Sequence, residues 1–297
     1  MKLTGLSLGL VLSPLLQMSA QVTVEVTLEQ EQFLGGEALP ADVRITNRSG
    51  QTLHFGNEPD WLTFLVESRD GFIVAKTGEV PVLGEFALES SKMATRHVDL
   101  APYFAISRPG RYNVTATVRV KPWDATLTTK PKSFDIVQGA KLWSQDFGVP
   151  AAEGGTRQSP EVRKYTLQQA NYLRTQLRLY LRLTDAAESK VIKVFSLGPM
   201  VSFSQPEPQL DKYSNLHLLY QNGARSFSYT MVTPDGDVVV RQTYDYANTR
   251  PRLQVDPDGK FVVAGGMRRV TSSDVPAPKS APEEVKPVRP VGAGTNF

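Results

Sequence analysis

The sequence contains no cysteine and only three histidines among its 297 residues. Without cysteine the chain can form no disulfide, carries no thiol nucleophile and builds no thiolate metal site. The histidines are His54, His97 and His217, and no two of them have the short spacing that places two metal ligands on one element. We therefore expect ordinary hydrophobic cores, no cofactor and no metal site. Each histidine is interpreted as an ordinary strand residue.

Long apolar runs are also missing. The longest, Leu3 to Leu16, is interrupted by Pro14, and the part before this proline covers about half of the roughly 20 residues that cross a bilayer. Lys2 precedes this run and the small pair Ser19-Ala20 follows it, which is the order of a secretory signal peptide over residues 1–20. Retention as a membrane anchor is the alternative. We expect cleavage after Ala20 and a secreted or periplasmic protein with no transmembrane segment after signal removal.

The motifs of common hydrolases are absent as well. The chain has no Gly-x-Ser-x-Gly elbow and no zinc-protease motif. Two carboxylate pairs, Asp235 with Asp237 and Asp256 with Asp258, could hold a calcium ion, but the later ligands of a calcium loop do not follow. Because Pro and Gly accompany both pairs, turns are the better interpretation. We assign no catalytic residue and no metal ligand.

The net charge of +3 is small and unevenly spread. Side chains give −3 over residues 21–138, +5 over residues 139–270 and +1 over the remainder. A positive excess favours an anionic partner such as an acidic glycan or a lipid headgroup, although a solvated surface accounts for it equally well. We expect no nucleic-acid partner.

Alternation of apolar and polar residues dominates residues 21–138. Residues 22–29 place four aliphatic side chains on one face and Thr or Glu on the other, and residues 62–66 and 112–120 repeat the pattern. This period of two is typical of half-buried strands. Turn residues such as Gly35-Gly36 and Pro109-Gly110 separate them. Short strands at this spacing predict a β-sandwich.

Three phrases of this region carry a family resemblance. Phe33–Leu39, Ala41–Gly50 and Pro109–Val114 resemble segments of bacterial immunoglobulin-like sandwiches of the macroglobulin and intracellular proteinase inhibitor types. The resemblance implies an immunoglobulin-like fold, with adhesion, spacing or proteinase inhibition as possible roles. The phrases encode strands and a tight turn, so they imply no chemistry.

Residues 139–270 predict a second, antiparallel β-sheet domain. Residues 160–177 allow a helix that begins at Ser159-Pro160, but the strict alternation of leucine over 177–183 favours strands. Two Pro-Asp-Gly sequences at 234–236 and 257–259 lie between β-prone runs and predict hairpins. Asp211–Leu218 resembles the beginning of β-propeller strands, although about 130 residues are too few to close a propeller. We expect a single blade-like sheet with a long hairpin.

Two groups of side chains are candidate binding residues. Trp61 follows two carboxylates in Glu58-Pro59-Asp60-Trp61, a composition found in sugar clefts, although a core position is the alternative for Trp61. A basic stripe opposite the leucines could contact an anion or a glycan, with a solvated sheet face as the alternative. The residues of this stripe are Arg174, Arg178, Tyr180 and Arg182.

The last segment, residues 271–297, contains five prolines and almost no large apolar residue, so we expect a disordered tail. Taken together, the sequence predicts an all-β protein: an immunoglobulin-like sandwich, a second antiparallel sheet domain and this tail. We expect an exported, non-catalytic binding or structural protein with a protein or glycan ligand outside the cytosol. The alternatives are a carbohydrate-active enzyme that uses two carboxylates and an extracytoplasmic proteinase inhibitor.

Overall fold

The computed structural model describes residues 21–150, 161–173 and 175–276. The predicted signal peptide, Arg174 and residues 277–297 of the predicted tail lie outside the described residues. The described chain is built from strands, with two short 3₁₀ segments at Ala101–Tyr103 and Lys121–Trp123. The expected all-β fold class is therefore confirmed. Within these residues no helix has the length and apolar character needed to cross a membrane.

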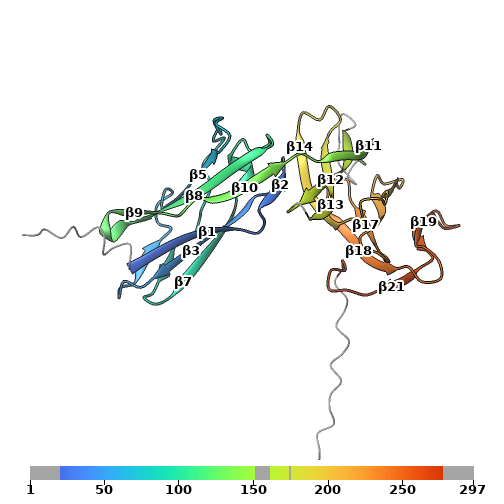
Figure 1. The fold of residues 1–297 in the computed structure, drawn as a ribbon. Helices are drawn as coiled ribbons and strands as arrows, with labels where there is room; N and C mark the ends of the chain where they lie inside the picture. Colours follow the sequence, from blue (N-terminus) through green and yellow to red (C-terminus); the bar gives the residue numbers. More distant parts are fainter. Residues whose placement is uncertain (1–20, 151–160, 174, 277–297) are drawn as a thin grey trace, which may run out of the picture. The chain divides into compact units, whose positions relative to one another are not determined.

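Two sheets form the N-terminal sandwich (Figure 1). One sheet has the order β1-β3-β7, formed by Val22–Leu28, Pro40–Asn47 and Met93–Asp99. The other has the order β2-β10-β8-β5, formed by Gln32–Leu34, Lys132–Val137, Gly110–Val120 and Leu62–Ser68, and β9 (Ala125–Thr128) pairs with β8. All pairs are antiparallel except β2 with β10, which is parallel. This strand arrangement is an immunoglobulin-like sandwich.

The apolar residues that alternate along β8 form part of the core of the sandwich. Tyr112, Val114, Ala116 and Val118 are buried, while the residues between them lie at the surface or half-buried. The Tyr112 ring stacks on Phe134 at 5.4 Å between centroids, and its hydroxyl donates a 2.5 Å hydrogen bond to the carbonyl oxygen of Arg108. This contact is the tyrosine corner of immunoglobulin-like domains, in which a tyrosine at the start of a strand fixes the preceding loop.

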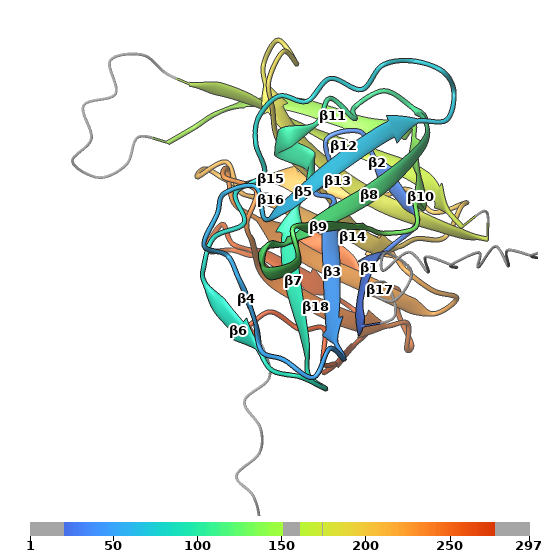
Figure 2. The same ribbon diagram turned by 90° about the vertical axis from the view of Figure 1, so that its left-hand side faces the viewer.

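A short antiparallel pair, β4 (Leu53–Phe55) with β6 (Phe86–Leu88), completes this part of the chain (Figure 2). Its buried residues Leu53, Phe55 and Leu88 belong to the same hydrophobic core as the sandwich. Asn47 is fully buried and holds the turn between β3 and β4. Its amide donates to the carbonyl oxygens of Gln51 at 2.7 Å and Leu88 at 2.8 Å. A buried amide satisfied in this way fixes how the chain leaves β3.

A separate four-stranded sheet has the order β11-β12-β13-β14. Its strands are Ala140–Gly148, Val162–Tyr172, Gln176–Asp185 and Val191–Pro199. Residues 162–172 are thus a strand, which confirms the interpretation based on alternation. The strand register explains why these residues form a strand rather than a helix. Leu167 pairs with Leu181 and Tyr165 pairs with Leu183, so four large side chains become buried together.

The described residues divide into two compact units. The first comprises those up to Phe147 together with Val162–Pro199, and the second comprises the rest. The predicted domain boundary at residue 138 stays a prediction.

The second unit contains the sheet β15-β16-β17-β18-β21 and the hairpin β19-β20. The sheet strands are Glu207–Leu210, Leu216–Gln221, Ser226–Val232, Val238–Asp245 and Met267–Arg269, and the hairpin strands are Arg252–Val255 and Phe261–Ala264. All neighbours are antiparallel, as expected. Both Pro-Asp-Gly sequences form turns, with positive φ at Gly236 and Gly259. Leu253 and Phe261 of the hairpin pack on Leu219 and Phe227 of the sheet.

Candidate functional site

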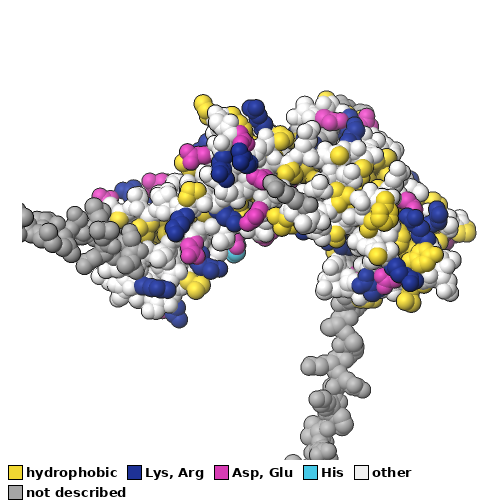
Figure 3. All heavy atoms as spheres, in the orientation of Figure 1, with side chains coloured by type: hydrophobic (Ala, Val, Ile, Leu, Met, Phe, Trp, Pro, Cys, Tyr) yellow, Lys and Arg dark blue, Asp and Glu magenta, His cyan; other side chains and the backbone are white. Residues whose placement is uncertain are grey.

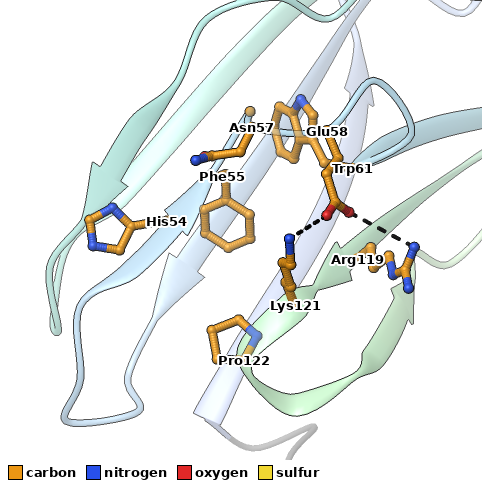
Figure 4. Close-up of a pocket in the computed structure, with 9 residues that line it drawn as sticks. His54, Phe55, Asn57, Glu58, Trp61, Arg119, Lys121 and Pro122 are labelled. Atoms are coloured by element: carbon orange, nitrogen blue, oxygen red, sulfur yellow. Dashed lines mark hydrogen bonds and ion pairs between the residues drawn. The ribbon is translucent and has the colours of Figure 1, made fainter.

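A small pocket opens beside Trp61 in the first unit (Figure 4). It encloses about 200 Å³, and its lining includes His54, Phe55, Glu58, Trp61, Arg119 and Lys121. Trp61 is only 3% exposed, and its indole N–H donates to the carbonyl oxygen of Val82 at 3.1 Å. Its ring packs against Phe55 and Phe86 at 5.6 and 5.7 Å between centroids. Trp61 is therefore both a core residue and part of the pocket lining.

The charged side chains of this pocket are paired with one another. Figure 4 shows the Glu58 carboxylate directed toward Lys121 and Arg119, at 2.5 and 3.9 Å from their nitrogens. The hydrogen bond and the positive charge of Lys121 lower the pKa of Glu58 below its usual value. A glycosidase acid needs a raised pKa so that it stays protonated. Glu58 therefore has the properties of an ion-pair partner rather than a proton donor.

Arg178, Tyr180 and Arg182 lie together on β13, and each contacts other residues of the first unit. Tyr180 is 2% exposed and packs with Leu34 of β2. Arg182 donates from Nη1 to the carbonyl oxygen of Gly35 at 2.8 Å. Arg178 lies 3.7 Å from the ring centroid of Tyr172.

The contacts of Tyr180 with Leu34 and of Arg182 with Gly35 join the four-stranded sheet to the sandwich. Burial raises the pKa of Tyr180 to about 12, so its hydroxyl stays protonated at neutral pH. Arg174 lies outside the described residues. A ligand role for Trp61, Arg174, Arg178, Tyr180 and Arg182 stays a prediction.

Positive and negative side chains are mixed on the face of the molecule that Figure 3 shows. Figure 3 shows dark-blue and magenta side chains interspersed across the face in view. Many of them form ion pairs, such as Arg111 with Asp70 at 3.1 Å and Lys164 with Glu188 at 3.0 Å. Exposed pairs of this kind contribute little stability but neutralise the local field.

A larger cavity than the one beside Trp61 lies in the second unit. It encloses about 510 Å³ between the sheet and the β19-β20 hairpin, and we call it the hairpin cavity. Its lining includes His217, Tyr229, Met231, Val255, Lys260 and Phe261. A cavity of this size, with an aromatic and aliphatic lining and a few polar groups, has the character of small-molecule sites.

Three titratable side chains meet in the wall of the hairpin cavity. His217 is 5% exposed, and its Nδ1 lies 2.8 Å from the Tyr229 hydroxyl. Its Nε2 lies 3.2 Å from Oδ2 of Asp211. The same carboxylate accepts hydrogen bonds from the backbone of Tyr213 and from both the backbone and the side chain of Asn215, each at 2.9 Å. Asp211 thus ties the turn before β16 to His217, which in turn orients Tyr229.

The ionisation states of Asp211 and Tyr229 follow from their surroundings. Burial by itself raises the pKa of Asp211, but the hydrogen bonds from Asn215, His217 and Tyr213 outweigh burial and lower it below the usual value. Since an ionised carboxylate only accepts, Nε2 of His217 carries the proton. Burial raises the pKa of Tyr229 to about 12, so its hydroxyl keeps its proton. The contact with His217 thus fixes a protonated Tyr229 hydroxyl in the wall of the hairpin cavity.

Comparisons with known proteins give little guidance. No protein-family model matches the chain, and no curated protein matches it. A search of solved structures finds the crystal structure of Spo0M, a sporulation control protein from Bacillus subtilis, at a TM-score of 0.29 and 10% identity. The match covers 60% of this chain and 91% of that one. A TM-score this low does not establish a shared fold.

The sequence interpretation placed His217 in a strand, and it lies in β16, but it did not foresee the partners of the ring. A signal is present, because Asp211, Asn215 and His217 all lie in the segment Asp211–Leu218, which resembles the beginning of β-propeller strands. Tyr229 could not be added to them, since it lies 12 residues away on the neighbouring strand. Among the residues that the structure describes, no three His, Asp or Glu side chains gather as a metal site.

Proposed function

We propose that this protein is an exported, non-catalytic binding protein and that the hairpin cavity holds its ligand. One observation carries the proposal: Asp211, His217 and Tyr229 hydrogen-bond in series in the wall of the hairpin cavity and hold the Tyr229 hydroxyl in place. Such a series of hydrogen bonds is a way to hold a polar group rigidly for recognition.

The lining indicates the kind of ligand. Phe261 and the half-exposed Tyr213 offer ring surface, while Lys212 and Lys260 supply donors at the rim. The Tyr229 hydroxyl is the polar group fixed in the wall. These groups suit a ligand with one apolar and one polar face, such as a sugar ring or a peptide side chain presented outside the cytosol.

Export is supported by the order of residues at the N-terminus, with Lys2, the apolar run and Ser19-Ala20 in the sequence of a signal peptide. Fusion of residues 1–20 to a reporter that is active only outside the cytosol tests it. We expect an active reporter, and N-terminal sequencing of the exported full chain should begin at Gln21. A reporter that stays inside the cell would refute export without bearing on the cavity.

The cavity is tested by filling it. Met231 lines the cavity, so Met231→Trp should occupy it, while Met267, which is 62% exposed in β21, offers the same substitution elsewhere in this unit. A library of glycans and peptides is screened by thermal shift on the mature protein. We expect at least one compound to raise Tm for the wild type and for Met267→Trp but not for Met231→Trp.

Two results would refute the proposal. One is a screen in which every stabilising compound acts equally on Met231→Trp, provided that this variant unfolds cooperatively. The other is turnover of glycosidic, ester or peptide substrates by the purified protein, because the residues around His217 would then belong to an active site.

A further inference from the structure

A second pocket in the same unit has a different chemical character from the hairpin cavity. It encloses about 400 Å³, and its lining includes Phe203, Ser204, Glu207, Gln221, Arg250 and Arg252. We call it the arginine pocket. These residues come from the loop before β15, from the first residue of β15, from the end of β16 and from the segment that leads into β19.

Arg250 and Arg252 have no carboxylate partner among the residues that the structure describes. Arg250 lies 5.2 Å from the ring centroid of Phe227, a contact that positions its guanidinium. In the described parts of the chain no carboxylate forms an ion pair with Arg250 or Arg252. Glu207 also lines the pocket, but its Oε2 accepts from the backbone N–H of Leu253 at 3.2 Å. Two arginines that line one pocket without a carboxylate partner favour an anionic ligand, and a carboxylate can bind a guanidinium with paired hydrogen bonds.

Ser204, in the lining of this pocket, has an unsatisfied hydroxyl group. Its hydroxyl oxygen is buried and has no hydrogen-bond partner. Buried hydroxyls without a partner are uncommon, since each costs the desolvation of a polar group. Because this oxygen is closed to solvent, a ligand in the arginine pocket reaches it only if the Ser204 side chain turns toward the pocket.

Phe203 adds an apolar surface at the edge of the pocket. Its side chain is 83% exposed, although large aromatic side chains are normally covered. An exposed ring beside polar groups is suited to pack against the apolar face of a ligand. The Gln221 amide nitrogen donates to the carbonyl oxygens of Gly223 and Ala224, which leaves its oxygen as an acceptor.

We infer that the arginine pocket binds an acidic saccharide, a sugar that carries a carboxylate. The carboxylate pairs with Arg250 and Arg252, the ring packs on Phe203, and the sugar hydroxyls donate to Glu207 and Gln221. A neutral sugar would leave both guanidinium groups unpaired, and a bare anion would leave Phe203 uncovered. This site is separate from the hairpin cavity and does not depend on it.

The test uses the full mature protein and isothermal titration calorimetry with three probes: trigalacturonate, neutral maltotriose and inorganic sulfate. We expect saturable binding of trigalacturonate and binding at least about tenfold weaker for the other two, because maltotriose lacks the charge-assisted hydrogen bonds and sulfate lacks the sugar ring. Arg252→Gln and Phe203→Ala should each weaken trigalacturonate binding about tenfold or more.

Arg269→Gln is the matched control, because it removes the same charge from the same unit but from an arginine already paired with Asp245 at 2.8 Å. It should bind trigalacturonate like the wild type. Equal binding of maltotriose or sulfate, no binding of trigalacturonate, or equal losses in Arg252→Gln and Arg269→Gln would each overturn the inference. Because Phe203 and Arg252 are exposed, both variants should fold, and their Tm is measured alongside.

Discussion

Tyr112 shows how a single polar atom fixes a loop of the sandwich. Tyr112→Phe removes the hydroxyl that donates to Arg108 and leaves the buried ring in place. We expect the free energy of unfolding to fall by about 1 kcal/mol, the usual value of one such hydrogen bond. Urea unfolding measures it as a lower midpoint with an unchanged slope.

The control for Tyr112 is Tyr103→Phe, which removes a hydroxyl from a half-buried ring in the same unit without removing a hydrogen bond. Equal midpoints for the two variants would show that the corner contributes no stability.

At the same scale, the sequence predicts burial better than it predicts polar contacts. Alternation identified Tyr112 and Val114 as core residues, because one face of their sheet meets the other sheet. It placed Tyr180 on a face left open to ligand, yet Leu34 and Val194 cover that face. A strand buried on both faces does not follow simple alternation. Contacts such as His217 with Tyr229 depend on strand register, which no local pattern specifies.

The β19-β20 hairpin depends on the conformation of its turn. Gly259 has φ +77°, and a Cβ there would meet no atom, so only backbone strain opposes a side chain. Gly259→Ala should therefore lower the free energy of unfolding of the second unit by about 1–2 kcal/mol. Thermal unfolding measures the change.

Gly148→Ala is the control for the turn, because Gly148 also has open space around it but no left-handed φ. It should leave Tm unchanged. A similar decrease in both variants would contradict the role of turn strain.

Elements of this kind were the most predictable part of the molecule. The Asp-Gly pairs predict hairpins because few residues tolerate the required backbone angles. The hairpin cavity and the arginine pocket were not predictable, since each combines segments that are far apart in the chain, such as Phe203 with Arg252.

Across the whole molecule, two carboxyl groups should respond to pH in opposite ways. The pKa of Asp211 is lowered in the folded protein, so its stabilising contribution is complete above its usual value of 3.8 and is lost as the pH falls through the folded value. Burial raises the pKa of Glu37 above 4.5, so its contribution is complete below that value and is lost as the pH rises through the folded value.

Urea unfolding of wild type, Asp211→Asn and Glu37→Gln from pH 7 to pH 3 tests both signs. The advantage of the wild type over Asp211→Asn should be greatest at pH 7 and shrink toward pH 3. Its stability relative to Glu37→Gln should improve as the pH falls. If the free energies of unfolding of the wild type and one of these variants change in parallel with pH, the carboxyl group replaced in that variant has the same pKa in the folded and unfolded states.

The contact between Leu34 and Tyr180 bears on how the first unit can be isolated. A shortened protein that ends at residue 138 would expose Leu34 to water and strip the carbonyl of Gly35 of its arginine. Such a fragment would expose an apolar side chain and an unpaired carbonyl group at the same edge, and it would tend to self-associate during expression. Extending it to Pro199 retains both partners, so that longer fragment is the better starting point for crystallisation or NMR.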